Sequence, residues 1–191
     1  WVAEQIVYFV GTAPSGDDGH INVSPKGDMR SFTVLGPLQV AYLDLYGSGI
    51  ETVAHLKQNG RIVVMMCSFG TQPRVVRFHG HGRVVEKADA EFDTLRARFA
   101  DTEELESSLR SIIVVDVTRI ADSCGFVVPI IAEDGTVRER KALYRTADAW
   151  IRQRGPTAIT EYCDVNNGTS IDGLPALTPS GLDIDEQLRE R

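Results

Sequence analysis

The sequence has few cysteines, a shortage of positive charge and no long hydrophobic run, and each shortage excludes a class of protein. Its three cysteines, Cys67, Cys124 and Cys163, are widely spaced and form no C-x-x-C pair, so a disulfide framework or a structural zinc site is not expected. Lysine and arginine number 20 against 27 acidic residues, a formal net charge of -7, with no basic stripe for nucleic acid. No apolar run approaches the ~20 residues of a membrane-spanning helix. We expect a cytoplasmic protein without a nucleic-acid or membrane partner.

What remains is the composition of an ordinary globular protein. Hydrophobic residues make up 42% of the 191 residues and charged residues 25%, which suits one domain with a sizeable core and a short appendage. Short apolar runs separated by turn residues fill the first half and predict antiparallel strands in a barrel or sandwich. The expected strands are Gln5–Val10, His20–Ser24, Ser31–Leu35, Val40–Leu45, Arg61–Phe69, Arg74–Val85 and Ile112–Val117.

Helical periodicity is confined to fewer segments. It predicts helices over 52–59, 89–99 and 136–154, followed by a Gly- and Pro-rich arm from residue 166. The fold class is therefore expected to be mainly β (α+β), with short helices and a helical C-terminal extension. We expect a barrel domain of residues 1–130, and C-terminal helices and an arm in residues 131–191 that pack on the barrel or on a dimer partner.

Glycines mark two places where the backbone is expected to be unusual. Gly80 and Gly82 interrupt the long strand 74–85, and glycine inside a strand is typical of a bulge or of a close approach by another backbone. The turn 46–49, with sequence YGSG, leads into the helix 52–59. Ser48 stands three residues before Glu51, as in a capping box, and Gly60 suits the C-cap of that helix.

The start of this helix is a candidate phosphate site. A helix start offers free backbone N–H groups and the positive end of a dipole. The hydroxyls of Ser48 and Thr52 add donors beside the backbone of Gly49. The alternative is that Ser48 only caps the helix, because capping boxes are common in sequences of no special function.

A second candidate is the strand that ends in Pro25-Lys26-Gly27-Asp28, which is expected to be a turn. Ile21 and Val23 are expected on one face of this strand, and Asn22 and Ser24 on the other. If the strand lies beside the helix start, Lys26 adds a positive charge to the same phosphate, and the backbone of 22–24 meets the edge of a ring system. Otherwise Lys26 is an exposed hairpin lysine.

The strand 74–85 carries three further candidates. Arg77 lies among apolar residues and needs an anionic partner, either a ligand or an acidic side chain. His79 and His81 share its face if no bulge intervenes and have the spacing of a chelating pair, but no third ligand is placed by spacing, so we expect no metal. A more specific version of the metal alternative is haem with a histidine as its axial ligand.

Taken in order, five segments resemble the pyridoxamine 5'-phosphate oxidase-related family of FMN-binding proteins. They are 23–27 (VSPKG), 42–44 (YLD), 47–49 (GSG), 61–66 (RIVVMM) and 77–82 (RFHGHG). The segments 124–129 (CGFVVP) and 170–175 (SIDGLP) are similar to one branch of that family. No single segment is specific, and the ordered set carries the resemblance.

The resemblance implies an FMN-binding split β-barrel that forms a two-fold homodimer, with FMN in a cleft between the subunits. It implies an FMN-dependent oxidoreductase with a small-molecule substrate, in which no catalytic side chain is identified. The alternative is a non-catalytic carrier or sensor of flavin, deazaflavin F420 or haem. The residues it assigns to the cofactor are Asn22, Val23, Ser24, Lys26, Ser48, Gly49, Thr52 and Arg77.

The sequence departs from the true oxidase in its charged residues. Ile21 stands where the oxidase has an arginine, and Glu51-Thr52 stands where its helix opens with an Arg-Lys pair. The C-terminal arginine and histidine that bind its substrate have no match. We therefore expect no activity on pyridoxine phosphates, and a phosphate site that relies on backbone N–H groups and hydroxyls.

Overall fold

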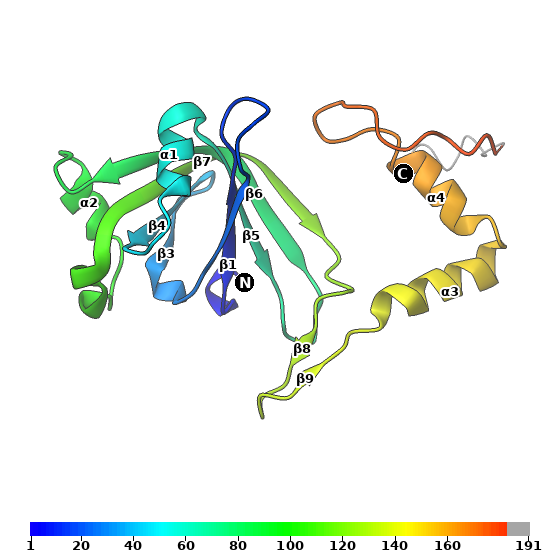
Figure 1. The fold of residues 1–191 in the computed structure, drawn as a ribbon. Helices are drawn as coiled ribbons and strands as arrows, with labels where there is room; N and C mark the ends of the chain where they lie inside the picture. Colours follow the sequence, from blue (N-terminus) through cyan, green and yellow to red (C-terminus); the bar gives the residue numbers. More distant parts are fainter. Residues whose placement is uncertain (183–191) are drawn as a thin grey trace. The chain divides into compact units, whose positions relative to one another are not determined.

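The computed structural model describes residues 1–182 in two compact units, Trp1–Arg138 and a second unit that begins at Glu139 (Figure 1). Whether the C-terminal residues pack on the barrel or on a partner stays a prediction, and the end of the expected arm, 183–191, lies outside the described residues. No helix within 1–182 combines the length and the apolar character needed to cross a membrane.

The first unit is built on one seven-stranded sheet in the order β2-β1-β5-β6-β7-β4-β3, with antiparallel pairing throughout. This confirms the expected mainly β split barrel with short helices. Its strands are β1 (Tyr8–Thr12), β2 (Asn22–Lys26), β3 (Phe32–Gly36), β4 (Gln39–Leu45), β5 (Arg61–Cys67), β6 (Val75–Glu86) and β7 (Leu109–Ser123).

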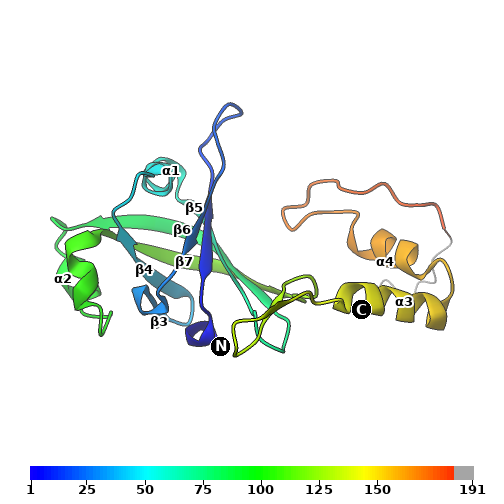
Figure 2. The ribbon, with the colours of Figure 1, turned by 60° about the horizontal axis from the view of Figure 1, so that its bottom comes forward.

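Short elements fill the connections between these strands (Figure 2). The helices are α1 (Glu51–Asn59) and α2 (Phe92–Arg96), with 3-10 turns η1 (Val2–Glu4), η2 (Met29–Ser31) and η3 (Glu103–Ser108). A small hairpin of β8 (Ile130–Ile131) and β9 (Val137–Arg138) ends the unit. The second unit holds α3 (Ala142–Arg154) and α4 (Ala158–Asn166), where the rings of Trp150 and Tyr162 lie 5.2 Å apart.

The strands β4 and β7 are buried on both faces. Ile113 and Val115 of β7 pack with Tyr42 of β4 in one core cluster, whereas Ile112 and Val114 belong to a second cluster. Phe92 of α2, Phe99 and Leu109 help to form the second cluster. Because helical segments cover the other face of this part of the sheet, the two strands read as continuous apolar runs rather than as an alternating pattern.

The two strand glycines have the predicted role. The pairing of β6 with β7 shifts between His79 and Gly80, and a Cβ at Gly80 would lie 2.1 Å from the carbonyl oxygen of Asp116. A Cβ at Gly82 would meet the side chain of Leu56 at 2.8 Å, so this glycine lets α1 lie against β6. The N–H of Gly82 also donates to the carbonyl of Gly60 at 2.7 Å.

Some local expectations are wrong. The residue that caps α1 is Ile50, and no side-chain hydrogen bond of a capping box forms, although Gly60 does end the helix with φ 71°. Pro25 and Lys26 belong to β2 rather than to a turn. Proline is tolerated there because β2 is an edge strand whose outer edge needs no ladder donor.

The helices α2 and α3 are shorter than their periodicity suggested. The structure has Phe92–Arg96 where 89–99 was expected, and Ala142–Arg154 where 136–154 was expected. Residues 137 and 138 instead pair with 130 and 131 as the small β8–β9 hairpin. Amphipathic spacing alone does not distinguish such extended flanks from the helix itself.

Two buried tyrosines provide a test of the core. The hydroxyl of Tyr8 lies 3.2 Å from Ser31 Oγ, whereas the buried hydroxyl of Tyr42 has no hydrogen-bond partner among the described residues. We expect Tyr42→Phe to keep or raise the free energy of unfolding, by up to about 1 kcal/mol, because it removes an unsatisfied polar group. Tyr8→Phe, the matched control, should lower it by about 1 kcal/mol. Urea unfolding of both variants measures the difference, and a clear loss for Tyr42→Phe would contradict this account.

Candidate functional site

A cavity of about 300 Å³ lies where β2, β4 and β7 approach the start of α1. Its walls come from the end of β2, the glycine-rich turn after β4, the first residues of α1 and the first residues of β7. The lining residues are Ser24, Lys26, Asp44, Leu45, Tyr46, Gly47, Ser48, Gly49, Glu51, Thr52 and Arg110.

A hydrogen-bonded link between β2 and α1 forms one wall. The side-chain amide of Asn22 donates to Thr52 Oγ1 at 3.0 Å and to Ser24 Oγ at 3.1 Å. Because these polar groups turn toward the helix start, the apolar side chains that alternate with them point away: Ile21, just before β2, is 77% exposed, and Val23 within β2 is 64% exposed. The link brings Lys26 into the cavity that the start of α1 also lines.

The start of α1 keeps its donors available. No side chain caps the helix at Ile50, and the first N–H with a partner inside the helix is that of Ala54, which donates to the carbonyl of Ile50 at 3.0 Å. The earlier N–H groups of a helix have no intrahelical partner. They are therefore suited to bind an anion together with the hydroxyls of Ser48 and Thr52.

The opposite wall contains a buried ion pair that the sequence analysis missed. Asp44 is 1% exposed, and its carboxylate accepts from Arg110 Nε at 2.6 Å and from Ser111 Oγ at 3.0 Å. The hydrogen bond with Asp44 raises the pKa of Arg110, so the guanidinium stays charged. The sequence did indicate that such a partner exists, because an aspartate within an apolar strand needs a charged or hydrogen-bonding partner.

The structure brings together most, but not all, of the predicted site residues. Ser24, Lys26, Ser48, Gly49 and Thr52 line the cavity, and Asn22 reaches it through Thr52.

Two others lie elsewhere. Val23 points to the opposite face of β2, where it lines a shallow hollow of about 340 Å³ with Ile21 and His79. Arg77 of β6 donates to Ser123 Oγ at 3.1 Å and does not line the cavity.

Volume alone does not identify the site. A larger hollow of about 510 Å³ lies between the N-terminal segment and the loop 68–72, with Trp1, Phe69 and Ile131 in its lining. No lysine or arginine of the described part of the chain lines it, whereas Lys26 and Arg110 both line the smaller cavity. Within residues 1–182, no group of three or more His, Cys, Asp or Glu side chains is arranged to hold a metal ion.

The comparison with known proteins then identifies the family. No protein-family model matches the sequence. A curated protein of Aspergillus flavus, the "Pyridoxamine 5'-phosphate oxidase family protein ustO", is 38% identical over 186 residues, which span 93% of this chain and 73% of the relative. The chain belongs to the pyridoxamine 5'-phosphate oxidase family.

Several solved structures are similar to this family member. An FMN-binding protein from Syntrophomonas wolfei is 16% identical with a TM-score of 0.49, over 63% of this chain and 78% of that one. An FAD-binding protein from Mesorhizobium loti is 11% identical with a TM-score of 0.46, over 63% and 87%. The haem storage protein HutZ from Vibrio cholerae is 15% identical with a TM-score of 0.45, over 64% and 88%. The family assignment rests on the Aspergillus relative.

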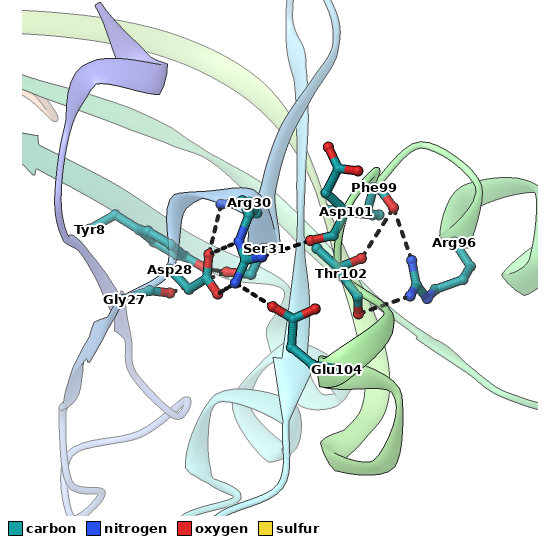
Figure 3. Close-up of polar contacts among 10 residues, drawn as sticks. All are labelled: Tyr8, Gly27, Asp28, Arg30, Ser31, Arg96, Phe99, Asp101, Thr102 and Glu104. Carbon is teal, nitrogen blue, oxygen red and sulfur yellow. Dashed lines mark hydrogen bonds and ion pairs between the residues drawn. The ribbon is translucent and has the colours of Figure 1, made fainter.

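In this member of the pyridoxamine 5'-phosphate oxidase family, the loop after Lys26 is held by one arginine, Arg30 (Figure 3). Its guanidinium binds both carboxylate oxygens of Asp28, at 2.9 and 2.6 Å, and also Glu104 Oε1 at 2.6 Å and the carbonyl of Asp101 at 2.9 Å. Asp28 and Asp101 both have positive φ, 54° and 53°. Arg30 therefore joins two left-handed turns that are distant in sequence and fixes the exit from β2.

The Arg30 contacts should make stability depend on pH. Hydrogen bonding to Arg30 is the largest cause that lowers the pKa of Asp28. The pKa of Glu104 is lowered first by a hydrogen bond from its own backbone N–H and second by hydrogen bonding to Arg30. A carboxylate with a lowered folded-state pKa stabilises the fold above its unfolded pKa of about 4, and this contribution is lost as the pH falls through the lowered value. We expect Arg30→Gln to reduce the free energy of unfolding at pH 7 and to have little effect near pH 2.

Urea unfolding of the wild type and of Arg30→Gln at several pH values measures this. Arg74→Gln is the matched control, because the ion pair of Arg74 with Asp122 joins the residue before β6 to β7 and does not involve the loop after Lys26. A difference between wild type and Arg30→Gln that stays constant down to pH 2 would show that the carboxylates are not the partners that matter.

Proposed function

We propose that this protein binds FMN and acts as an FMN-dependent oxidoreductase on a small molecule. The observation that supports this most directly is the Asn22–Thr52 hydrogen bond, which sets the end of β2 and its Lys26 beside the start of α1. The ammonium of Lys26, the hydroxyls of Ser24, Ser48 and Thr52, and the free N–H groups of the helix start form a donor set that suits a phosphate monoester. Membership of a family whose name refers to an oxidase agrees with the redox activity.

The outer edge of β2 offers backbone groups to the flavin ring of the cofactor. Among the described residues 1–182 this strand pairs only with β1, so no other strand of that range uses the backbone N–H and C=O groups along its outer edge. We propose that the backbone of Asn22, Val23 and Ser24 binds the polar edge of the flavin ring there. FMN, when bound, supplies the redox chemistry, and the chain binds and orients it.

We propose further that the protein is a homodimer with the cofactor at the interface. Ile21 and Val23 expose apolar side chains on the face of β2 opposite the cavity, beside Gly11 and Val63. Contiguous apolar surface of this kind is typical of an interface. Sedimentation measurements at dilute concentration test the proposal: a monomer that still holds FMN would refute it.

The substrate is proposed to differ from pyridoxine phosphates. Glu51 follows the glycine-rich turn and lines the cavity, at the position where the oxidase has a positive charge. A second anionic group near this end of the site would meet that carboxylate. A turnover assay with pyridoxine 5'-phosphate should therefore give no product.

The first test is the absorption spectrum of the purified protein, before and after addition of FMN. Oxidised flavin bands that remain with the protein after gel filtration support the proposal. A Soret band would favour haem, a band near ~420 nm would favour deazaflavin, and no gain of colour with FMN would refute a flavin site (these bands are properties of the cofactors themselves). Reduction by a nicotinamide donor and reoxidation by an acceptor would distinguish an enzyme from a carrier.

The phosphate site is tested by the double variant Lys26→Met, Thr52→Val. A hydrogen bond to a charged group contributes about 1.5–3 kcal/mol, so the Kd for FMN should rise at least about tenfold. Lys57→Met is the control, because Lys57 lies in the last turn of α1 and forms an ion pair with Glu86 away from the cavity. An unchanged Kd in the double variant would mean that the phosphate binds elsewhere.

A further inference from the structure

The cavity contains a cation that the resemblance to the family did not predict. The helix opens with Glu51-Thr52 in place of two basic residues, and Ile21 replaces an arginine, so the sequence analysis offered only Lys26 and Arg77 as cations for the cofactor. Of these two, Lys26 lines the cavity and Arg77 does not. In the structure, Arg110 enters the lining from β7, a strand that the sequence analysis did not connect with phosphate binding. We propose that Arg110, held by the buried carboxylate of Asp44, is the second cation that binds the cofactor phosphate.

A β-bulge places Arg110. The pairing of β4 with β7 runs Asp44 to Ser111 and then Leu45 to Leu109, so Arg110 is the extra residue at the shift in register. A bulge redirects the side chain of the extra residue, and bulges occur preferentially next to active sites. In a regular ladder Arg110 would lie opposite a β4 residue. Because of the bulge, Arg110 lies beside the carboxylate of Asp44 and lines the cavity.

The ion pair leaves Arg110 with free donors. A guanidinium has five N–H groups, and the described residues take two of them: Nε and one terminal nitrogen donate to Asp44 at 2.6 and 3.3 Å. The side chain of Arg110 is 28% exposed, whereas that of Asp44 is 1% exposed. The donors that remain belong to a group that is already oriented, which lowers the entropy lost when an anion binds.

The exposed ion pairs of the same unit differ in this respect. Arg83 with Glu91 and Arg74 with Asp122 have both partners about half exposed. Ion pairs with two exposed partners contribute little to stability. The Asp44 carboxylate is instead buried and also accepts from Ser111 Oγ, so Arg110 is paired with a fixed anion.

The charge balance of the cavity lining favours a second cation. The lining contains two basic side chains, Lys26 and Arg110, and two acidic ones, Asp44 and Glu51. Asp44 is bonded to Arg110, and Glu51 stabilises the positive end of α1. Without Arg110 the lining would carry a net negative charge, which opposes a phosphate. With it the formal charge is zero, and the helix start and hydroxyls add net attraction.

This inference rests on the proposed FMN site, and riboflavin, which lacks the phosphate, separates the two. We would measure the Kd of FMN and of riboflavin for the wild type, Arg110→Lys, Arg110→Gln and the control Arg83→Gln. We expect Arg110→Gln to weaken FMN on the order of tenfold to a hundredfold and riboflavin by less than about twofold. Arg110→Lys should lie between wild type and Arg110→Gln, because a single ammonium replaces the planar fork. Arg83→Gln should change neither.

A purely structural role for the ion pair has a different signature. Arg110→Gln leaves Asp44 buried without its partner and lowers stability, so the double variant Asp44→Asn, Arg110→Gln, which removes both charges, keeps the test valid. If either folded variant binds FMN as tightly as the wild type, or loses FMN and riboflavin equally, Arg110 does not bind the phosphate. If the wild type binds neither FMN nor riboflavin, the proposed flavin site is refuted, and the role proposed for Arg110 is refuted with it.

Discussion

The structure depends above all on the position of β7 between β6 and β4. The pairing with β6 extends from Val75–Ser123 to Glu86–Ser111, and the pairing with β4 from Gln39–Asp116 to Leu45–Leu109. Alternate residues of β7 enter the two core clusters on opposite faces of the sheet. A shift of β7 by one residue would exchange these faces. Gly80, where a Cβ would collide with the backbone of Asp116, fixes the alignment at one point, and the bulge at Arg110 adjusts it at another.

The candidate site lies at the border of this well-packed sheet, where strands end and polar groups become available. Two polar links frame it: Asn22 with Thr52 on the β2 side, and Asp44 with Arg110 on the β7 side. Both are short, and both include a largely buried partner, Thr52 in the first and Asp44 in the second. Buried polar groups that are fully bonded rigidify their surroundings. The rigid frame is therefore part of the site, while the surface on the outer face of β2 remains apolar.

Local sequence rules predicted much of the fold and only part of the site. The strands, the bulge at Gly80 and the C-cap at Gly60 each follow from one residue type in one local pattern. Ser48 and Glu51 matched a local pattern too, yet the helix begins two residues later than a capping box with Ser48 as N-cap needs, and its donors stay uncapped. The Asp44–Arg110 pair was missed because its members are 66 residues apart and meet only through sheet pairing. A register shift of this kind has no local signature, whereas an aspartate in an apolar strand does predict that some partner exists.

The order in which the cavity walls occur along the chain has a consequence for biosynthesis. The strand that brings Lys26 and the helix that begins at Glu51 are made early, but the wall that carries Arg110 belongs to β7, the last strand of the main sheet to be translated. Domains fold on the ribosome from the N-terminus as the chain emerges. The edge strands β2 and β3 are therefore exposed while the centre of the sheet is still missing. The cavity is complete only when β7 has left the ribosome, so a ligand that needs all of its walls binds after translation of the whole barrel, and cannot act as a template for its early folding.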